Sequence, residues 1–253
     1  MPRITPIRLA AACALALSMS LPITASAGAK GFSADLRVVG SGGKVLAERT
    51  LGTATISVTA SPKATCFGSG TGGSGKAVSI AGNTAMGLLA RASKSTGSLR
   101  PLLISDSFDF GLALCGVGRS VARGSSSWYL KVNHRALQVS GDAAKIRPGD
   151  EVLWALATTE APDYAYPDEL SLTAPRTATA GSAFGVRVFS YDEKGRRTPV
   201  AGARVTGAGA PTGSDGRTTV TLTKPGRLIA RHDEEIPSAR VAVCVGGKCP
   251  AGS

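Results

Sequence analysis

Aromatic residues are scarce in this sequence. They make up 5% of its 253 residues, whereas Lys and Arg together number 29 against 17 for Asp and Glu. Proteins that bind single-stranded nucleic acids stack bases on aromatic side chains placed among their basic residues. The basic residues here are scattered without such neighbours, which argues against a nucleic-acid partner. The net charge of +12 instead favours anionic cell-envelope polymers or lipid headgroups as partners.

Catalytic and metal-binding motifs are also lacking. The sequence has two histidines, His134 and His232, and it contains no G-x-S-x-G, H-E-x-x-H or D-x-D-x-D-G pattern. His232 is followed by three acidic residues, which we interpret as a polar turn, with a metal site as the alternative. Asp106 and Asp109 have the spacing of a carboxylate pair, but we interpret them as turn residues rather than a glycosidase pair. We therefore predict no catalytic residue, no cofactor and no metal.

The glycine-rich segment FGSGTGGSGKA, at residues 67–77, fits parts of two nucleotide-binding motifs. A Walker loop needs a hydroxyl residue after its Lys, and Ala77 follows Lys76 here. Both motifs also need a buried strand before and a helix directly after, whereas residues 77–80 have an extended pattern. The segment is predicted to be a flexible surface loop.

Long apolar runs are absent after the first 27 residues. Arg3 and Arg8 precede the apolar run of residues 9–21, and Ala25 and Ala27 fit an A-x-A cleavage site. This order predicts a secretory signal peptide over residues 1–27. No later segment is long and apolar enough for an anchor, so the mature chain is expected to have none.

Four cysteines remain after the predicted leader: Cys66, Cys115, Cys244 and Cys249. An even number in an exported chain predicts disulfides, although four cysteines allow three pairings. The last two lie close together in CVGGKC, where the Gly-Gly pair can make the turn. We therefore pair Cys66 with Cys115 and Cys244 with Cys249, with a thiolate metal site as the alternative.

Residues 34–157 are predicted to form an α+β domain with one main helix. The helix begins at residues 83–84 and ends at Gly97, and it has one apolar face. Residues 127–133, SWYLKVN, alternate as a strand with Trp128 on its apolar face. Residues 151–157 form another strand with Trp154 in phase. Both tryptophans are therefore interpreted as core residues rather than ligand-stacking residues.

This part of the chain resembles the transcobalamin C-terminal-like domain of unknown function. The matching positions are Trp128, Val132, Asn133, Gly149, Asp150, Val152 and Trp154. The resemblance implies a β-grasp-like fold, found in vitamin B12 carriers and exported bacterial proteins. In those carriers the domain caps the ligand against a separate helical barrel. Asn133 and Asp150 are expected to brace turns rather than touch a ligand.

Residues 158–169, TTEAPDYAYPDE, are acidic and contain two prolines, which predicts a linker. Residues 170–245 have short, evenly spaced strand patterns separated by turn signals, so an all-β sandwich is expected, with a tail at 246–253. This half resembles bacterial immunoglobulin-like (Ig-like) and carboxypeptidase-regulatory-like modules, which implies a spacer or adhesion role.

These features together predict a secreted or cell-surface, non-catalytic binding or adhesion protein. One alternative is an extracytoplasmic protein that captures a small molecule, with a corrinoid as one example. Another is an exported hydrolase, because catalytic residues can converge from distant positions.

Overall fold

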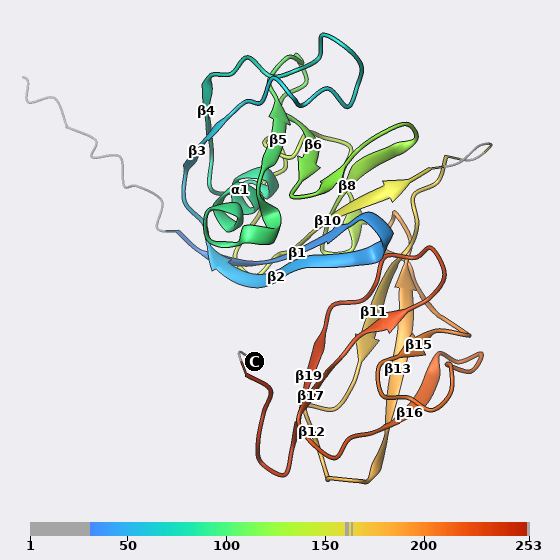
Figure 1. The fold of residues 1–253 in the computed structure, drawn as a ribbon. Helices are drawn as coiled ribbons and strands as arrows, with labels where there is room; N and C mark the ends of the chain where they lie inside the picture. The colour runs from blue at the N-terminus through green and yellow to red at the C-terminus, as the bar shows by residue number, and fades with distance from the viewer. Residues whose placement is uncertain (1–30, 160–161, 163, 252–253) are drawn as a thin grey trace, which may run out of the picture. The chain divides into compact units, whose positions relative to one another are not determined.

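The computed structural model describes residues 31–159, 162 and 164–251, and their regular secondary structure is mostly β-strand (Figure 1). These residues contain one α-helix, α1 (Ala85–Ser95), and the short 3-10 helices η1 (Ser41–Gly43) and η2 (Gly97–Leu99). The predicted signal peptide at 1–27 lies outside the described residues. So do three residues of the predicted linker and the last two residues of the tail.

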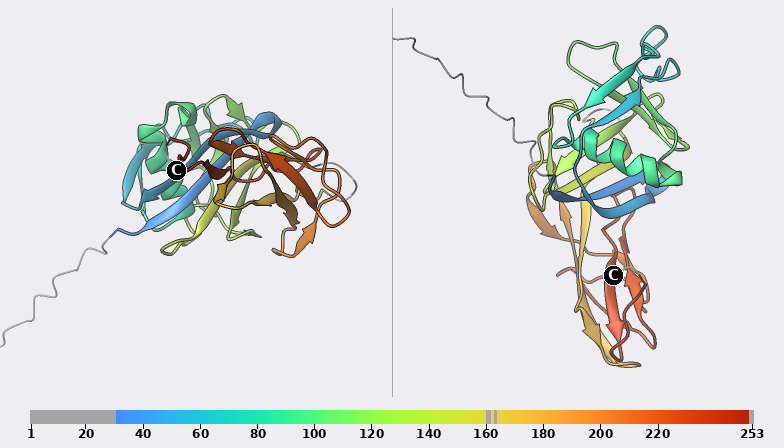
Figure 2. Two further views of the ribbon diagram at one scale, coloured as in Figure 1. Left: turned by 90° about the horizontal axis from the view of Figure 1, so that it is seen from below. Right: turned by 90° about the vertical axis from the view of Figure 1, so that its left-hand side faces the viewer.

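The largest sheet has five strands in the order β2-β1-β10-β8-β9. Their bounds are β1 (Ser33–Gly40), β2 (Lys44–Gly52), β8 (Ser126–Val132), β9 (Arg135–Ala136) and β10 (Glu151–Thr158). The central pair, β1 and β10, is parallel, and the other pairs are antiparallel. Helix α1 lies against one face of this sheet (Figures 1 and 2).

Helix α1 begins where the sequence predicted. Thr84 is its N-cap, and the hydroxyl oxygen of Thr84 accepts a hydrogen bond from the Gly87 N–H at 3.0 Å. Met86, Leu88 and Leu89 are fully buried, which confirms the predicted apolar face. These side chains pack with Trp154 and neighbouring sheet residues in one hydrophobic cluster, so the helix is held by packing as well as by its cap.

Two smaller sheets lie in the same part of the chain. One pairs β3 (Ile56–Thr59) with β4 (Ala77–Ile80), and the other joins β5 (Leu102–Ser105), β6 (Ala113–Val117) and β7 (Ser120–Val121). Strand β4 directly follows the glycine-rich segment, where a nucleotide-binding loop would need a helix. Residues 67–76 themselves have no helix or strand and are mostly exposed, which confirms the predicted surface loop, while its flexibility stays a prediction.

Residues 170–245 contain strands and no helix in this fully described stretch. They are β12 (Thr177–Ala178), β13 (Ala183–Tyr191), β14 (Arg197–Pro199), β15 (Arg204–Val205), β16 (Arg217–Thr221), β17 (Gly226–Leu228), β18 (Ala230–Arg231) and β19 (Val241–Val245), preceded by β11 (Glu169–Thr173). They form three small sheets: β11-β13-β14 with β16 also on β13, β12-β19-β17, and β15-β18. This all-β content is compatible with an Ig-like module without establishing one.

Buried apolar side chains form three clusters. The first lies between the five-stranded sheet and α1, and the second lies among strands β11 to β19. The third joins Tyr129 and Leu153 of the five-stranded sheet to Ile236, with Tyr166 packed against it. Both faces of the five-stranded sheet are therefore covered. The predicted domain boundary at 158–169 stays a prediction.

The predicted α+β class, with a β-grasp-like first domain, is wrong. The described residues are mostly β, with one 11-residue helix and several small sheets. Turns interrupt the strands so often that β7, β9, β12, β15 and β18 have only two residues each. Among the described residues, no helix is long and apolar enough to cross a membrane.

Candidate functional site

A groove runs along the first half of β8. Strand β9 pairs only with Lys131 and Val132, so residues 126–129 have no strand on their outer side among the described residues. The cause is local, because Asn133 and His134 both have positive φ, at 50° and 65°, and turn the chain back immediately. The short return strand then leaves the preceding part of β8 open at the sheet edge.

This hollow, which we call the aromatic groove, has a volume of about 450 Å³. That volume lies in the usual range for sites that hold small molecules. No Asp, Glu, Lys, Arg or His is among the described residues that line it, although 18% of the chain is charged. Its walls include Trp128 and Tyr129 of β8, Leu114 of β6 and the segment 137–141. The groove is therefore an electrically neutral site on a basic protein.

Exposed apolar side chains stand on the rim of the aromatic groove. Phe67 is 57% exposed, Phe110 is 61% exposed and Val139 is 55% exposed. Phe108 links the two phenylalanines, with ring centroids 5.3 Å from Phe67 and 4.9 Å from Phe110. Large apolar groups are seldom left in water together unless something covers them. Their gathering at one groove marks it as a contact surface.

The Cys66–Cys115 disulfide holds this rim in place by tying the glycine-rich loop to β6. The same loop is held by Asp106, whose carboxylate accepts hydrogen bonds from the Ser74 N–H at 2.7 Å and hydroxyl at 2.6 Å. These hydrogen bonds lower the pKa of Asp106. Asp106 therefore braces a loop here, and the groove wall that carries Phe67 is fixed at two points.

Three polar atoms at the groove residues lack hydrogen-bond partners among the described residues. They are Nε1 of Trp128, the hydroxyl of Tyr129 and the hydroxyl of Ser140, and each exposes less than 1 Å². Burial, followed by the charge of Glu193, raises the pKa of Tyr129, so its hydroxyl stays protonated. Its ring is stacked on that of Tyr166, with centroids 4.1 Å apart. Buried polar groups without partners are rare and need an explanation.

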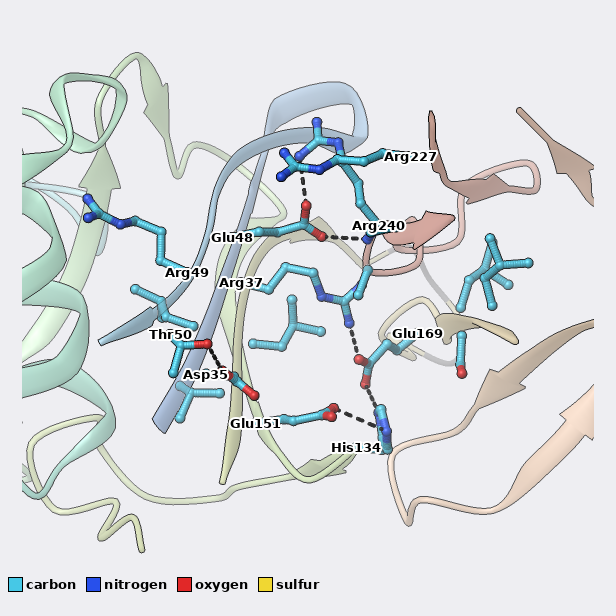
Figure 3. Close-up of a pocket in the computed structure, with 18 residues that line it drawn as sticks. Asp35, Arg37, Glu48, Arg49, Thr50, His134, Glu151, Glu169, Arg227 and Arg240 are labelled. Atoms are coloured by element: carbon cyan, nitrogen blue, oxygen red, sulfur yellow. Dashed lines mark hydrogen bonds and ion pairs between the residues drawn. The ribbon is translucent and has the colours of Figure 1, made fainter. Parts of the chain in front are cut away.

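A second hollow, which we call the charged cleft, lies beside β1, β2 and β11 and has a volume of about 580 Å³ (Figure 3). Its charged groups largely face one another. Glu48 accepts from Arg240 Nη1 at 2.7 Å, and Arg37 donates to both Glu169 and the Pro237 carbonyl. The charges of this cleft are therefore engaged with partners inside the protein.

Glu169 is the centre of the charged cleft and is only 2% exposed. Besides Arg37, it lies 3.4 Å from Lys131 Nζ and 3.1 Å from His134 Nδ1. Burial alone would raise the pKa of Glu169, but His134, Arg37 and Lys131 together lower it. A carboxylate held ionised in this way is suited to joining strands rather than to donating a proton.

Lys131 is fully buried and completes the same cluster. Its ammonium donates to the carbonyls of Tyr191 at 2.9 Å and Asp192 at 3.1 Å. Burial lowers the pKa of Lys131, and the charge of Glu169 opposes this shift. The His134 ring also stacks on Tyr191 with centroids 3.9 Å apart. Strand β8 is thereby fixed to the turn that follows β13.

The residues of the family motif have different roles in the structure. Asn133 and Asp150 bond to each other at 2.9 Å, and each also accepts a backbone N–H, from Glu151 and Arg147 respectively. Gly149 has a φ of +78°, which that turn requires. Trp154 is buried and donates to the Ala85 carbonyl at 3.3 Å. Trp154 belongs to the core cluster and Trp128 packs against it, as predicted, and of this motif only these two also line the aromatic groove.

The remaining predicted positions lie elsewhere. Cys66 is bonded to Cys115 and Cys244 to Cys249, which are the pairs expected from the sequence. His232 lies 3.2 Å from Glu235 in a turn, and no group of three or more possible metal-ligating side chains occurs among the described residues.

No protein-family model and no curated protein matches the chain. One solved structure that is similar to part of it is haptocorrin in complex with Cbi. The identity is 13% and the TM-score is 0.31. The match covers 50% of this chain and 25% of the haptocorrin chain, so this chain spans about a quarter of that protein's length.

Sequence reasoning missed Lys131, Glu169 and Tyr166. Lys131 lies on the face of β8 that looked solvent-exposed, and the other two lie in the segment taken for a linker. A signal for Tyr166 was present in the two tyrosines of that short segment, since large aromatic side chains tend to be buried.

Proposed function

We propose that this chain is a non-catalytic binding protein of an extracytoplasmic compartment and that the aromatic groove holds its ligand. The observation that carries the proposal is a hollow with no charged side chain among its described lining residues and with Phe67, Phe110 and Val139 exposed on its rim. Apolar hollows with a few polar groups are the usual form of small-molecule sites. The groups of the charged cleft, by contrast, are engaged with one another.

The compartment is supported by the two disulfides, which persist in oxidising surroundings. In this proposal the predicted signal peptide directs export and is then removed. Residues 34–157, which carry most of the groove lining, are the recognition module related to the transcobalamin C-terminal-like domain. Residues 170–245 act as a spacer that holds this module away from its point of attachment.

A neutral fluorescent dye tests the proposal. N-phenyl-1-naphthylamine brightens when it leaves water, and we expect saturable binding that the double variant Phe67→Ser, Phe110→Ser weakens at least about tenfold, equal to roughly 1.4 kcal/mol. Tyr164→Ser is the matched control, because Tyr164 is 63% exposed but does not line the groove. The thermal midpoints of all variants should stay close to that of the parent. Equal binding by parent and double variant would refute the groove as the site.

A second candidate function is adhesion to an anionic polymer. The Phe189 ring has the guanidinium carbons of Arg187 and Arg197 at 4.6 and 3.4 Å from its centroid. The two like charges are therefore held within about 8 Å of each other, and no acidic side chain pairs with either among the described residues. Arg217 lies opposite Arg187 in the pairing of β16 with β13, and it forms an ion pair with Asp215 at 3.3 Å. Such a face suits a chain of repeated negative charges.

Binding to polyphosphate tests the adhesion candidate. The variant Arg187→Gln, Arg197→Gln should lower retention on a polyphosphate column and flatten its salt dependence, whereas Lys63→Gln, Arg119→Gln removes the same charge elsewhere. Equal losses of retention in both variants would show only a general effect of net charge.

Corrinoid capture, which the family motif suggests, is tested by titration with cyanocobalamin. Absence of a spectral shift and of binding heat would remove it.

A further inference from the structure

The three polar atoms without partners indicate what kind of molecule enters the aromatic groove. We infer that the ligand is uncharged, has a flat apolar body and carries a carbonyl-type hydrogen-bond acceptor that reaches Nε1 of Trp128. This inference rests on the proposed function and specifies its ligand. It follows from the charge, the hydrogen-bonding groups and the ring surfaces of the groove.

Charge is excluded by the composition of the walls. Transfer of an ionised group from water into an apolar site is strongly unfavourable unless an opposite charge or several hydrogen bonds meet it. The described lining residues include no charged side chain, and their polar members are hydroxyl, amide and indole groups. A carboxylate or an ammonium on the ligand would have no counter-ion among these described residues.

The acceptor is indicated by Trp128. An indole N–H donates a hydrogen bond and cannot accept one, so it needs an acceptor as its partner. Nε1 of Trp128 has none among the described residues. The hydroxyl of Ser140 is a further group in the same lining that is able to donate, whereas Tyr129 points to the opposite face of β8. A carbonyl oxygen has two lone pairs, so it can accept from the indole and still accept from a second donor.

In this inference, access requires a movement of the Trp128 side chain. Nε1 exposes less than 1 Å², although the residue as a whole is only partly buried. Tyr129 is held by its stacked partner Tyr166. A ligand that enters beside Trp128 therefore gains an indole hydrogen bond when that ring turns, and the protein loses an unsatisfied donor.

The flat body is indicated by the ring surfaces. Phe67, Phe110 and Trp128 all line the groove, and two of them are more than half exposed at its rim. Aromatic rings pair best with other flat π-systems in offset or edge-to-face geometry. A planar ring system therefore covers this rim with more contact than a flexible chain of similar size.

Three compounds with one ring system test the inference by isothermal titration calorimetry. 2-Acetylnaphthalene has the acceptor, 2-ethylnaphthalene lacks it, and 2-naphthoate carries a charge. We expect the ketone to bind about three- to tenfold more tightly than the hydrocarbon, and the carboxylate to bind at least tenfold more weakly than the ketone. Trp128→Phe should abolish the preference for the ketone while leaving the hydrocarbon within about twofold. Ser140→Ala should retain most of that preference.

The outcomes separate this inference from the function on which it rests. Equal affinities for the ketone and the hydrocarbon would overturn the inference, and so would a preference for the ketone that survives Trp128→Phe. In either case, dye binding that depends on Phe67 and Phe110 would still support the groove as the site. Tighter binding of 2-naphthoate would overturn the neutral-ligand argument in the same way. If none of the three compounds binds, the inference is wrong, and the dye experiment decides the proposed function independently.

Discussion

Replacement of Glu169 by Gln is expected to destabilise the protein severely. Glu169 is almost fully buried and faces Arg37, Lys131 and His134. The Gln side chain has the same shape, so the substitution removes the negative charge without opening a cavity. It leaves a fully buried ammonium and a mostly buried guanidinium without the carboxylate that neutralises them.

The magnitude follows from that imbalance. Breaking a buried ion pair by removing one partner lowers the free energy of unfolding by about 3–5 kcal/mol, because a buried charge loses its compensation. For a chain of this size, that is a fall in the thermal midpoint of roughly 6–20 °C. Urea unfolding at pH 7, followed by tryptophan fluorescence with the disulfides intact, measures the change directly. A loss below about 1 kcal/mol would refute the reasoning.

Glu48→Gln is the matched control for this measurement. Glu48 also pairs with an arginine, Arg240, but the side chains of that pair are 20% and 39% exposed. Water solvates such a pair and reduces its net contribution, so the expected loss is about 0–1 kcal/mol. A loss as large as that of Glu169→Gln would show that burial is not the deciding factor.

The destabilisation caused by Glu169→Gln should also depend on pH. The pKa of Glu169 in the folded protein lies below its ordinary value of 4.5. Its ionised form therefore stabilises the fold above that pH, and the stabilisation is lost as pH falls through the folded-state value. Because Gln does not titrate, the gap between parent and Glu169→Gln should shrink between pH 5 and pH 3. A gap that stays constant over this range would contradict the ionised state assigned to Glu169.

The substitution Lys131→Met tests whether Lys131 and Glu169 stabilise the fold together. In the Glu169→Gln background, this change removes the buried ammonium that has lost its counter-charge. The second substitution should therefore be less harmful there than in the parent, with a coupling energy of about 1–3 kcal/mol in a double-mutant cycle. Additive losses would show that Lys131 and Glu169 do not act together.

Three further predictions concern the framework of the groove. Removing the disulfide with Cys66→Ala, Cys115→Ala should lower the free energy of unfolding by up to about 4 kcal/mol in urea melts, since the bond closes a loop with a sequence separation of 49. Thr84→Ala, which removes the helix cap, should cost about 1 kcal/mol in the same assay, and Thr84→Ser should restore most of it. Gly141→Ala should lower the thermal midpoint by several degrees and shift the tryptophan emission, because the new methyl carbon would lie 2.6 Å from the ring of Trp154.

The parts of the fold that the sequence revealed are those with strong local signals. Thr84 and the apolar positions after it identified α1, and the alternation of residues 127–133 identified β8. The spacing of Cys244 and Cys249, with two glycines between them, made their pairing the natural choice. Each of these features depends on residues close together in the chain, so pattern and capping arguments reach them.

The fold class and the charged cleft depend on contacts between distant residues. Short strands separated by turns do not show which of them pair, and the parallel pairing of β1 with β10 joins residues more than a hundred positions apart. Glu169 belonged to an acidic, proline-containing segment that has the composition of a linker. Only its packing against Arg37, which lies 132 residues earlier, makes it the buried centre of an ion cluster.

Strand β8 shows why the candidate site was hidden as well. Its alternation places Trp128 and Leu130 on the face toward the helix and Tyr129 and Lys131 on the other, which is the pattern of a strand with one solvated face. Because Tyr166 and the turn after β13 cover that second face, both sets of side chains are enclosed. Alternation shows which residues share a face, but it cannot show whether a polar face is covered by a distant segment.

The open first half of β8, with indole and phenol groups on its two sides, follows from the early turn at Asn133 and His134. That turn places the neutral groove and the ion cluster on one strand but on different side chains. A substitution at Trp128 should therefore change ligand binding, whereas one at Lys131 should change stability.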